Sequence, residues 1–241
     1  MSLAVVLVEP AGPLNVGSVA RLCANFGLSN LRLVAPRCDH LGEEARRMAV
    51  HAEALLEQAQ LFPDLPSALA DCRRVVATSG RTEEEALPLS SAQDCLSWLA
   101  ATPPEHRAAL VFGREDRGLS NQELLQAGRL LRLSTSESYA SLNLSHAVGI
   151  CLHELQQSRT SAEAAPTNAS AEPCARGNLE AALSDAEDLL LEVGFLYPHT
   201  AEARMAKLRA LLQRGQVRDE EVALLRGMVR QLRWAAQRHC P

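Results

Sequence analysis

Residues 3–21 read LAVVLVEPAGPLNVGSVAR, and this stretch decides how the N-terminal part of the chain folds. Its first six residues are apolar, which is typical of a parallel strand that is covered on both faces. The residues EPAGP then force a loop, and the spacing after them predicts a helix from about Asn15 to Phe26, with Gly27 as its C-terminal cap. Because no basic segment precedes the apolar residues, we expect no signal peptide.

The alternation of strand and helix continues along the chain. We expect further strands at residues 31–34, 74–78, 108–112 and 130–133, and further helices at residues 43–59 and 143–157. Strands that are joined through helices form a parallel sheet with helices on its faces. The predicted fold class is therefore α/β, a doubly wound domain with a parallel sheet over residues 1–157, followed by a small all-α module.

The composition changes after residue 157. Residues 158–177 are rich in Ala, Ser, Thr, Pro and Glu and have no hydrophobic period, so we expect a flexible linker. Residues 178–241 are predicted to form a helical module. Its three helices are expected where apolar residues recur at helical spacing, at residues 179–193, 200–214 and 219–237.

The cysteines and the hydropathy exclude several classes of protein. The seven cysteines are scattered and form no C-x-x-C pair, so neither a metal site nor a disulfide framework is expected. No apolar run approaches the roughly 18 residues of a membrane span. We therefore expect a cytoplasmic protein with free thiols, no bound metal and no membrane contact.

The charge is unevenly distributed. The chain carries a net charge of −5, which is unfavourable for a nucleic-acid-binding protein. From Ala201 onward, however, nine Lys or Arg residues stand against four Asp or Glu residues, a local net charge of +5. Aromatic residues make up only 3% of the chain, which argues against stacking platforms for single-stranded nucleic acid.

Three short motifs combine small residues with a few polar ones near the predicted ends of strands. They are NVGSVAR at 15–21, FGRE at 112–115 and SLNLS at 141–145. Ligands of open α/β sheets bind at the carboxyl ends of the strands, and Gly113 permits close approach of a ligand. A phosphate loop is disfavoured because Ser18 stands where that loop needs a lysine. Plain helix caps and a solvated charged turn remain the alternative interpretations.

Taken together and in this order, the motifs resemble the signature of the SPOUT methyltransferases, in the TrmH-like branch that methylates ribose 2′-hydroxyls of RNA. Residues 77–80 (ATSG) extend the resemblance. The tail, with GFLYPHT at 194–200 and LRGMVRQL at 225–232, is similar to that of TrmJ-type tRNA 2′-O-methyltransferases. The resemblance implies a trefoil knot between about residues 112 and 153.

The resemblance also implies a cofactor, S-adenosylmethionine, held mainly by backbone groups. The matching positions are Thr78, Ser79, Gly80, Gly113, Leu133, Ala140, Ser141 and Leu142. The positions that match the family's catalytic residues are Arg21, Asn15, Glu115, Ser141 and Asn143. Since the pKa of arginine lies above about 12, we interpret Arg21 as a clamp on a phosphate of the substrate and leave the base unassigned.

The expected reaction is methylation of a ribose 2′-hydroxyl in tRNA, at nucleotide 32 of the anticodon loop. The alternatives are ribosomal RNA or another tRNA site as substrate, and a knotted RNA-binding module without catalysis. The family also implies a homodimer. Eight basic residues of the C-terminal helices are expected to hold the tRNA, unless they only solvate the helix faces: Arg204, Lys207, Arg209, Arg214, Arg218, Arg226, Arg230 and Arg233.

Overall fold

A single parallel sheet organises the N-terminal domain. The computed structural model describes residues 2–80, 87, 89–136, 138–139, 141–162 and 172–239. The sheet has seven strands in the order β3-β2-β1-β6-β4-β7-β5, and every pair of neighbours is parallel. The strands are β1 (Ser2–Val8), β2 (Asn30–Val34), β3 (Gln60–Phe62), β4 (Cys72–Thr78), β5 (Leu89–Ser90), β6 (Arg107–Phe112) and β7 (Arg129–Leu131). The predicted α/β fold class is confirmed, whereas the knot stays a prediction.

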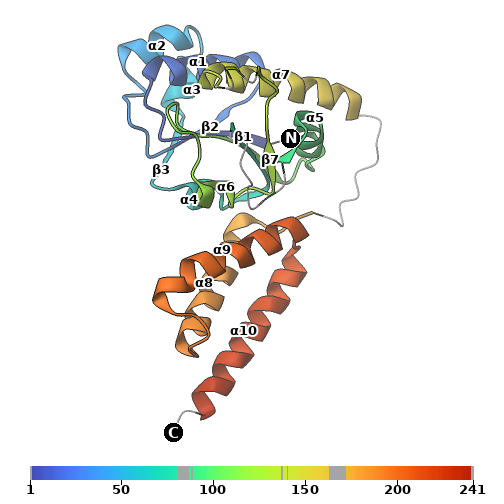
Figure 1. Ribbon diagram of the computed structural model, residues 1–241. Helices are drawn as coiled ribbons and strands as arrows, with labels where there is room; N and C mark the ends of the chain where they lie inside the picture. Colours follow the sequence, from blue (N-terminus) through green and yellow to red (C-terminus); the bar gives the residue numbers. More distant parts are fainter. Residues whose placement is uncertain are drawn as a thin grey trace.

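Helices cover both faces of this sheet (Figure 1). The helices of the N-terminal domain are α1 (Pro13–Asn25), α2 (Glu43–Ala49), α3 (Glu53–Glu57), α4 (Leu65–Leu69), α5 (Ala92–Ala100), α6 (Asn121–Leu124) and α7 (Leu144–Ala162). Helices α1, α2, α3, α5 and α7 lie on one face, and α4 and α6 lie on the other. Because side chains alternate along a strand, β1 sends Leu3, Val5 and Leu7 into one core and its other apolar residues into the second.

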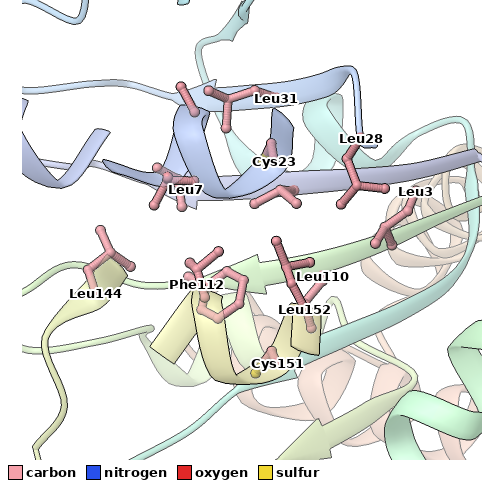
Figure 2. Packing of buried hydrophobic residues seen from close by; sticks show 14 of the residues in the cluster. Leu3, Leu7, Cys23, Leu28, Leu31, Leu110, Phe112, Leu144, Cys151 and Leu152 are labelled. Carbon is pink, nitrogen blue, oxygen red and sulfur yellow. The ribbon is translucent and has the colours of Figure 1, made fainter. Parts of the chain in front are cut away.

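The core beneath α1 and α7 is tightly packed (Figure 2). Cys23 of α1 and Cys151 of α7 belong to the same buried cluster as Leu7 of β1 and Phe112 of β6. Burial raises the pKa of both thiols to about 12, so they stay protonated and pack as small apolar groups. The cysteines of the described part of the chain are free thiols, as the sequence predicts.

One predicted helix is broken. The helix expected at residues 43–59 is α2 and α3, separated at Val50, whose φ of 57° is incompatible with a continuing right-handed helix. Arg46 bridges the break, since its guanidinium contacts Glu53 at 3.3 Å and Glu57 at 2.9 Å. The sequence also did not predict the short elements, which have two to nine residues, because so few residues show no clear hydrophobic period. These elements are β3, α4, β5, α5 and α6.

The predicted linker is structured at both ends. Helix α7 continues beyond Gln157 to Ala162, and α8 (Arg176–Glu192) begins within the predicted linker. Glu172 is buried and forms an ion pair with Arg74 of β4, while Arg73 donates a hydrogen bond to the carbonyl of Pro173 at 2.9 Å. Composition alone predicted a flexible segment here, but a long-range ion pair fixes its C-terminal end.

The C-terminal module packs on the second face of the sheet. It consists of α8, α9 (Pro198–Gly215) and α10 (Asp219–His239), which share a small apolar core. Ala210 of α9 is buried in the core that lies beneath α4 and α6. At the same boundary Arg73 pairs with Asp219 at 2.7 Å, and the amide of Gly177 donates to the carbonyl of Ala70 at 3.0 Å. The module therefore takes part in covering the sheet.

None of the described helices is both long and apolar enough to cross a membrane.

The buried ion pair between the two parts of the chain generates a prediction. Replacing Glu172 by Gln leaves the Arg74 guanidinium buried without its anion, so we expect the free energy of unfolding to fall by about 3–5 kcal/mol. Urea denaturation measures this loss. Glu53→Gln is the matched control, because water screens its exposed pair with Arg46 and the pair contributes little to stability. Equal losses in both variants would contradict the assigned role of Glu172.

Candidate functional site

The carboxylate of Glu115 joins the first two motifs. It accepts hydrogen bonds from the backbone amides of Ala11 at 3.1 Å and Gly12 at 3.0 Å, and from Nδ2 of Asn15 at 3.1 Å. These donors lie in the loop after β1 and in the first turn of α1, about a hundred residues earlier in the chain. The loops that follow β1 and β6 are thus held together by one side chain.

Asn143 adds the third motif to this network. Its Nδ2 donates to Oδ1 of Asn15 at 3.0 Å. Its Oδ1 accepts from the amide of Ser145 at 2.9 Å and from the hydroxyl of the same residue at 2.8 Å. Asn143 therefore caps the N-terminus of α7, as the alternative interpretation held, and also orients Asn15. A chain of hydrogen bonds runs from the start of α7 to the carboxylate of Glu115.

The protonation state of Glu115 follows from these contacts. Partial burial acts to raise the pKa of its carboxyl group, but the hydrogen bonds from Ala11, Asn15 and Gly12 outweigh that effect. The pKa lies below the ordinary value of 4.5, so Glu115 is an anion at neutral pH. An anion accepts hydrogen bonds only, which fixes the direction of every bond in the chain.

Arg114 braces the loop that follows β6. Its buried guanidinium forms an ion pair with Glu9, and it contacts the two carboxylate oxygens of Glu123 at 2.8 Å and 2.9 Å. Glu123 also completes a capping box with Ser120 at the start of α6. The sequence analysis did not predict this cluster. The spacing S-x-x-E was its only local signal.

A cavity of about 380 Å³ opens beside this network, at the carboxyl ends of β4 and β6. Every described residue of the predicted cofactor set lines it: Thr78, Ser79, Gly80, Gly113, Leu133, Ser141 and Leu142. Ala140 lies outside the described residues. Several other lining residues, among them Leu124, Thr135 and Ala147, were not predicted because they lie outside the motifs.

Gly113 sets the shape of the cavity wall. A Cβ atom at this position would lie 2.3 Å from the carbonyl carbon of Gly118 and 2.4 Å from the amide nitrogen of Leu119. Such distances leave no room for any side chain, so the loop after β6 can fold back closely only with glycine here. Gly118, whose φ is 68°, makes the turn that brings the loop back.

The structure does not bring all of the predicted catalytic residues together. Asn15, Glu115 and Asn143 form one network, and Ser141 lines the cavity. Arg21 lies on the exposed surface of α1 and does not line the cavity. Within the described part of the chain, Arg21 has no hydrogen-bond or ion-pair partner. Its guanidinium is thus available to a ligand outside the cavity.

The basic residues of the C-terminal helices divide into two groups. Four of the eight form ion pairs with carboxylates of their own module: Arg209 with Glu180, Arg218 with Glu220 and Glu221, Arg226 with Asp185, and Arg233 with Glu192. Lys207, Arg204 and Arg230 are exposed and form no ion pair among the described residues. Arg214 lines a separate cleft with Trp98 and Arg129.

The described residues contain no group of His, Cys, Asp or Glu side chains that is arranged to hold a metal ion.

Comparison with known proteins agrees with this organisation. Residues 2–153 match the SpoU rRNA methylase family, and residues 178–240 match the tRNA methyltransferase TrmJ C-terminal domain. A tRNA (cytidine/uridine-2′-O-)-methyltransferase TrmJ from Klebsiella pneumoniae is 33% identical over 95% of both chains. A tRNA (cytidine/uridine/adenosine-2′-O-)-methyltransferase TrmJ from Pseudomonas aeruginosa is 33% identical over 93% of this chain and 91% of its own.

Solved structures show the same likeness. The crystal structure of TrmJ from Z. mobilis superposes with a TM-score of 0.84 at 29% identity, over 96% of this chain and 99% of that one. The SpoU methyltransferase AviRb from Streptomyces viridochromogenes, in complex with AdoMet, shares the fold at a TM-score of 0.52 and 20% identity, over 66% of this chain and 60% of its own. With the matched methylase domain, the matched C-terminal domain and full-length relatives at 33% identity, the chain belongs to the SpoU methylase family and to its TrmJ-type members.

Proposed function

We propose that this chain transfers the methyl group of S-adenosylmethionine to a ribose 2′-hydroxyl of tRNA, at nucleotide 32 of the anticodon loop, in the cytoplasm. The observation that carries the proposal is the cavity that residues 78–80 and the motifs at 112–115 and 141–145 line, beside the network of Asn15, Glu115 and Asn143. Likeness to tRNA 2′-O-methyltransferases over nearly the whole chain supports tRNA as the substrate.

The cavity suits S-adenosylmethionine in size and chemistry. Its volume lies within the range of small-molecule sites. Leu119, Leu133 and Leu142 offer apolar contact to an adenine, and the backbone at Gly113 can approach a ligand without a side chain between them. When bound, S-adenosylmethionine supplies an electrophilic methyl group on a positively charged sulfur.

The residues around the cavity would position the ribose. The Glu115 carboxylate holds the Asn15 amide in one orientation, and Asn143 locks it from the other side. Ser141 lies on the cavity wall beside this pair and is the polar group that we assign to the target ribose. Fixing the two reactants in line supplies much of the rate in such transfers.

Arg21 would act on the substrate from outside the cavity. Its exposed guanidinium is permanently charged and suits a phosphate of the bound RNA. The arginine would thereby orient the nucleotide and stabilise negative charge on the 2′-oxygen. Within the C-terminal module, the exposed Arg204, Lys207 and Arg230 are the cations that we assign to the RNA backbone.

We further propose that two copies of the chain pair through α1 and α7. These helices pack together, and they expose Leu14, Ile150 and the neighbouring Leu142 to solvent. Large apolar side chains that gather on one face mark an interaction surface. The face adjoins the cavity, because Leu142 also lines it, so a partner subunit would lie next to the bound ribose.

Methyl transfer to tRNA tests the reaction directly. We expect label from methyl-labelled S-adenosylmethionine to appear on the 2′-oxygen of nucleotide 32 when total tRNA is the substrate. Arg21→Ala should lower the transfer rate at least a hundredfold, about 3 kcal/mol, while cofactor affinity by calorimetry stays within about twofold, because Arg21 lies outside the cavity. Arg47→Ala, which removes an exposed arginine from α2, should behave as wild type.

Other outcomes would redirect the assignment. Label at another tRNA nucleotide, or on ribosomal RNA alone, would keep the chemistry and change the substrate. Cofactor binding without any transfer would leave an RNA-binding module. Near-wild-type turnover of the Arg21→Ala variant would show that the arginine has no role in the reaction.

The lowered pKa of Glu115 predicts a pH dependence of stability. A carboxylate whose pKa is lower in the folded chain stabilises the fold above about pH 4.5, and this contribution is lost as the pH falls through the folded-state value. Glu115→Gln should therefore reduce the free energy of unfolding at pH 7 and flatten its decline below pH 4.5, as urea denaturation would measure. An unchanged slope would show that the hydrogen bonds do not depend on the charge.

A charged side chain placed in the proposed interface between the two copies tests the dimer. We expect wild-type protein to sediment at twice the 26.1 kDa of one chain, and Ile150→Glu to sediment as the monomer with loss of methyl transfer. Leu61→Glu is the control, because Leu61 is exposed on β3 at the edge of the sheet. A wild-type monomer that transfers methyl groups would refute the pairing.

A further inference from the structure

The segment between α8 and α9 presents aromatic rings to solvent. Gly194, with φ of 73°, turns the chain out of α8. The next three residues alternate: Leu196 is only 2% exposed, while Phe195 and Tyr197 are 61% and 55% exposed. The amide of Leu196 donates to the carbonyl of Leu190 at 2.9 Å, so the buried residue anchors the segment and fixes the rings on its outer side. We name Phe195, Tyr197 and His199 the aromatic ledge.

Phe195 differs from the other phenylalanines of this chain in its exposure. The chain contains four phenylalanines and two tyrosines; the other three phenylalanines are buried or half-buried, whereas the other tyrosine, Tyr139, is 79% exposed. On the ledge, the ring of Tyr197 stacks on that of His199, with 5.9 Å between centroids and 22° between planes. Burial of a phenylalanine ring stabilises a fold, and Phe195 forgoes much of that contribution.

Cations border the ledge. The guanidinium of Arg204 lies 5.7 Å from the centroid of the Phe195 ring, and its Nη1 donates to the carbonyl of Phe195 at 3.0 Å. That bond uses one of the five N–H donors of the guanidinium. Lys207, three residues further along the same helix, is also exposed. Rings flanked by positive charge suit a ligand that has both a flat apolar surface and an anionic group.

Contacts connect the ledge with the loop that lines the cavity. Glu202, five residues after Tyr197 and about 8 Å along the helix, is hydrogen-bonded to Gln122 of α6. The neighbouring Glu123 holds Arg114, which lines the cavity. The first turns of α9 therefore contact α6, and Glu123 of α6 holds the loop that lines the cavity. A ligand that reaches both the ledge and the cavity would contact both on the same copy of the chain.

We propose that the aromatic ledge stacks an unpaired nucleobase of the RNA substrate, while Arg204 and Lys207 contact the phosphates beside that base. The inference rests on the proposed RNA methyltransferase function and adds a recognition element for single-stranded nucleotides. Bases stack on aromatic side chains irrespective of sequence, and unpaired loop nucleotides are the part of RNA that can splay out to do so. The low overall aromatic content does not oppose this, because Phe195 and Tyr197 lie together in one segment and both are exposed.

Three substitutions at Phe195 separate stacking from general apolar contact. With full-length protein and an unmodified tRNA transcript carrying a fluorophore, we expect Phe195→Ala to raise the dissociation constant about tenfold. Phe195→Leu should lose as much, since it keeps apolar area without a ring, and Phe195→Trp should stay within about threefold of wild type. Val193→Ala, an exposed apolar neighbour, is the control and should bind as wild type.

The outcomes are distinct from those that test the reaction. If wild-type protein methylates tRNA and Phe195→Ala binds it with unchanged affinity, the ledge is not a binding element and the proposed reaction stands. If Phe195→Leu binds as wild type, the ledge is an apolar contact, such as a protein docking surface, and stacking is wrong. A fully double-stranded RNA should bind wild type and Phe195→Ala equally; a preserved tenfold difference would also refute the proposal.

Discussion

The hydrogen bonds of the Glu115 carboxylate are the constraint on which the site depends. Three donors converge on it from the loop after β1 and the first turn of α1. Two of them are backbone amides, for which the carboxylate is the acceptor. Asn143 extends the network to α7, so three segments that are distant in sequence acquire one geometry. The cavity lies beside this network, because Glu115 also lines it.

A second constraint shapes the wall of the cavity from within the loop after β6. Arg114 sits between Glu9 and Glu123, and these two hydrogen-bonded carboxylates raise its pKa above the ordinary value while their own are lowered. These ion pairs thus hold the loop after β6 to the end of β1 and to α6. Gly113 then allows the fastened loop to approach its own backbone closely. The charge of Arg114 and the absence of a side chain at Gly113 together define the cavity wall that a cofactor would contact.

The sequence predicted the long apolar strands and the motif residues, because both leave a local pattern. Residues 3–8 are apolar throughout, and Gly113 stands in a motif whose family resemblance is specific. What it did not predict depends on distant partners. The break at Val50 and the ion pair of Glu172 with Arg74 have no local signature, since each is decided by atoms that the fold brings together. The same holds for the module on the second face of the sheet.

The ion pairs of the arginines show why composition overstated the number of cations that the C-terminal helices offer to RNA. The count from Ala201 onward finds a net positive charge, but it leaves out α8, whose carboxylates form ion pairs with Arg209, Arg226 and Arg233. Arg176 is buried at the boundary with the sheet, where desolvation lowers its pKa to about 10 and a glutamine is its partner. Few cations therefore remain for phosphates. Binding of RNA by so acidic a chain would depend less on ion release, and more on stacking and shape, than its arginine content suggests.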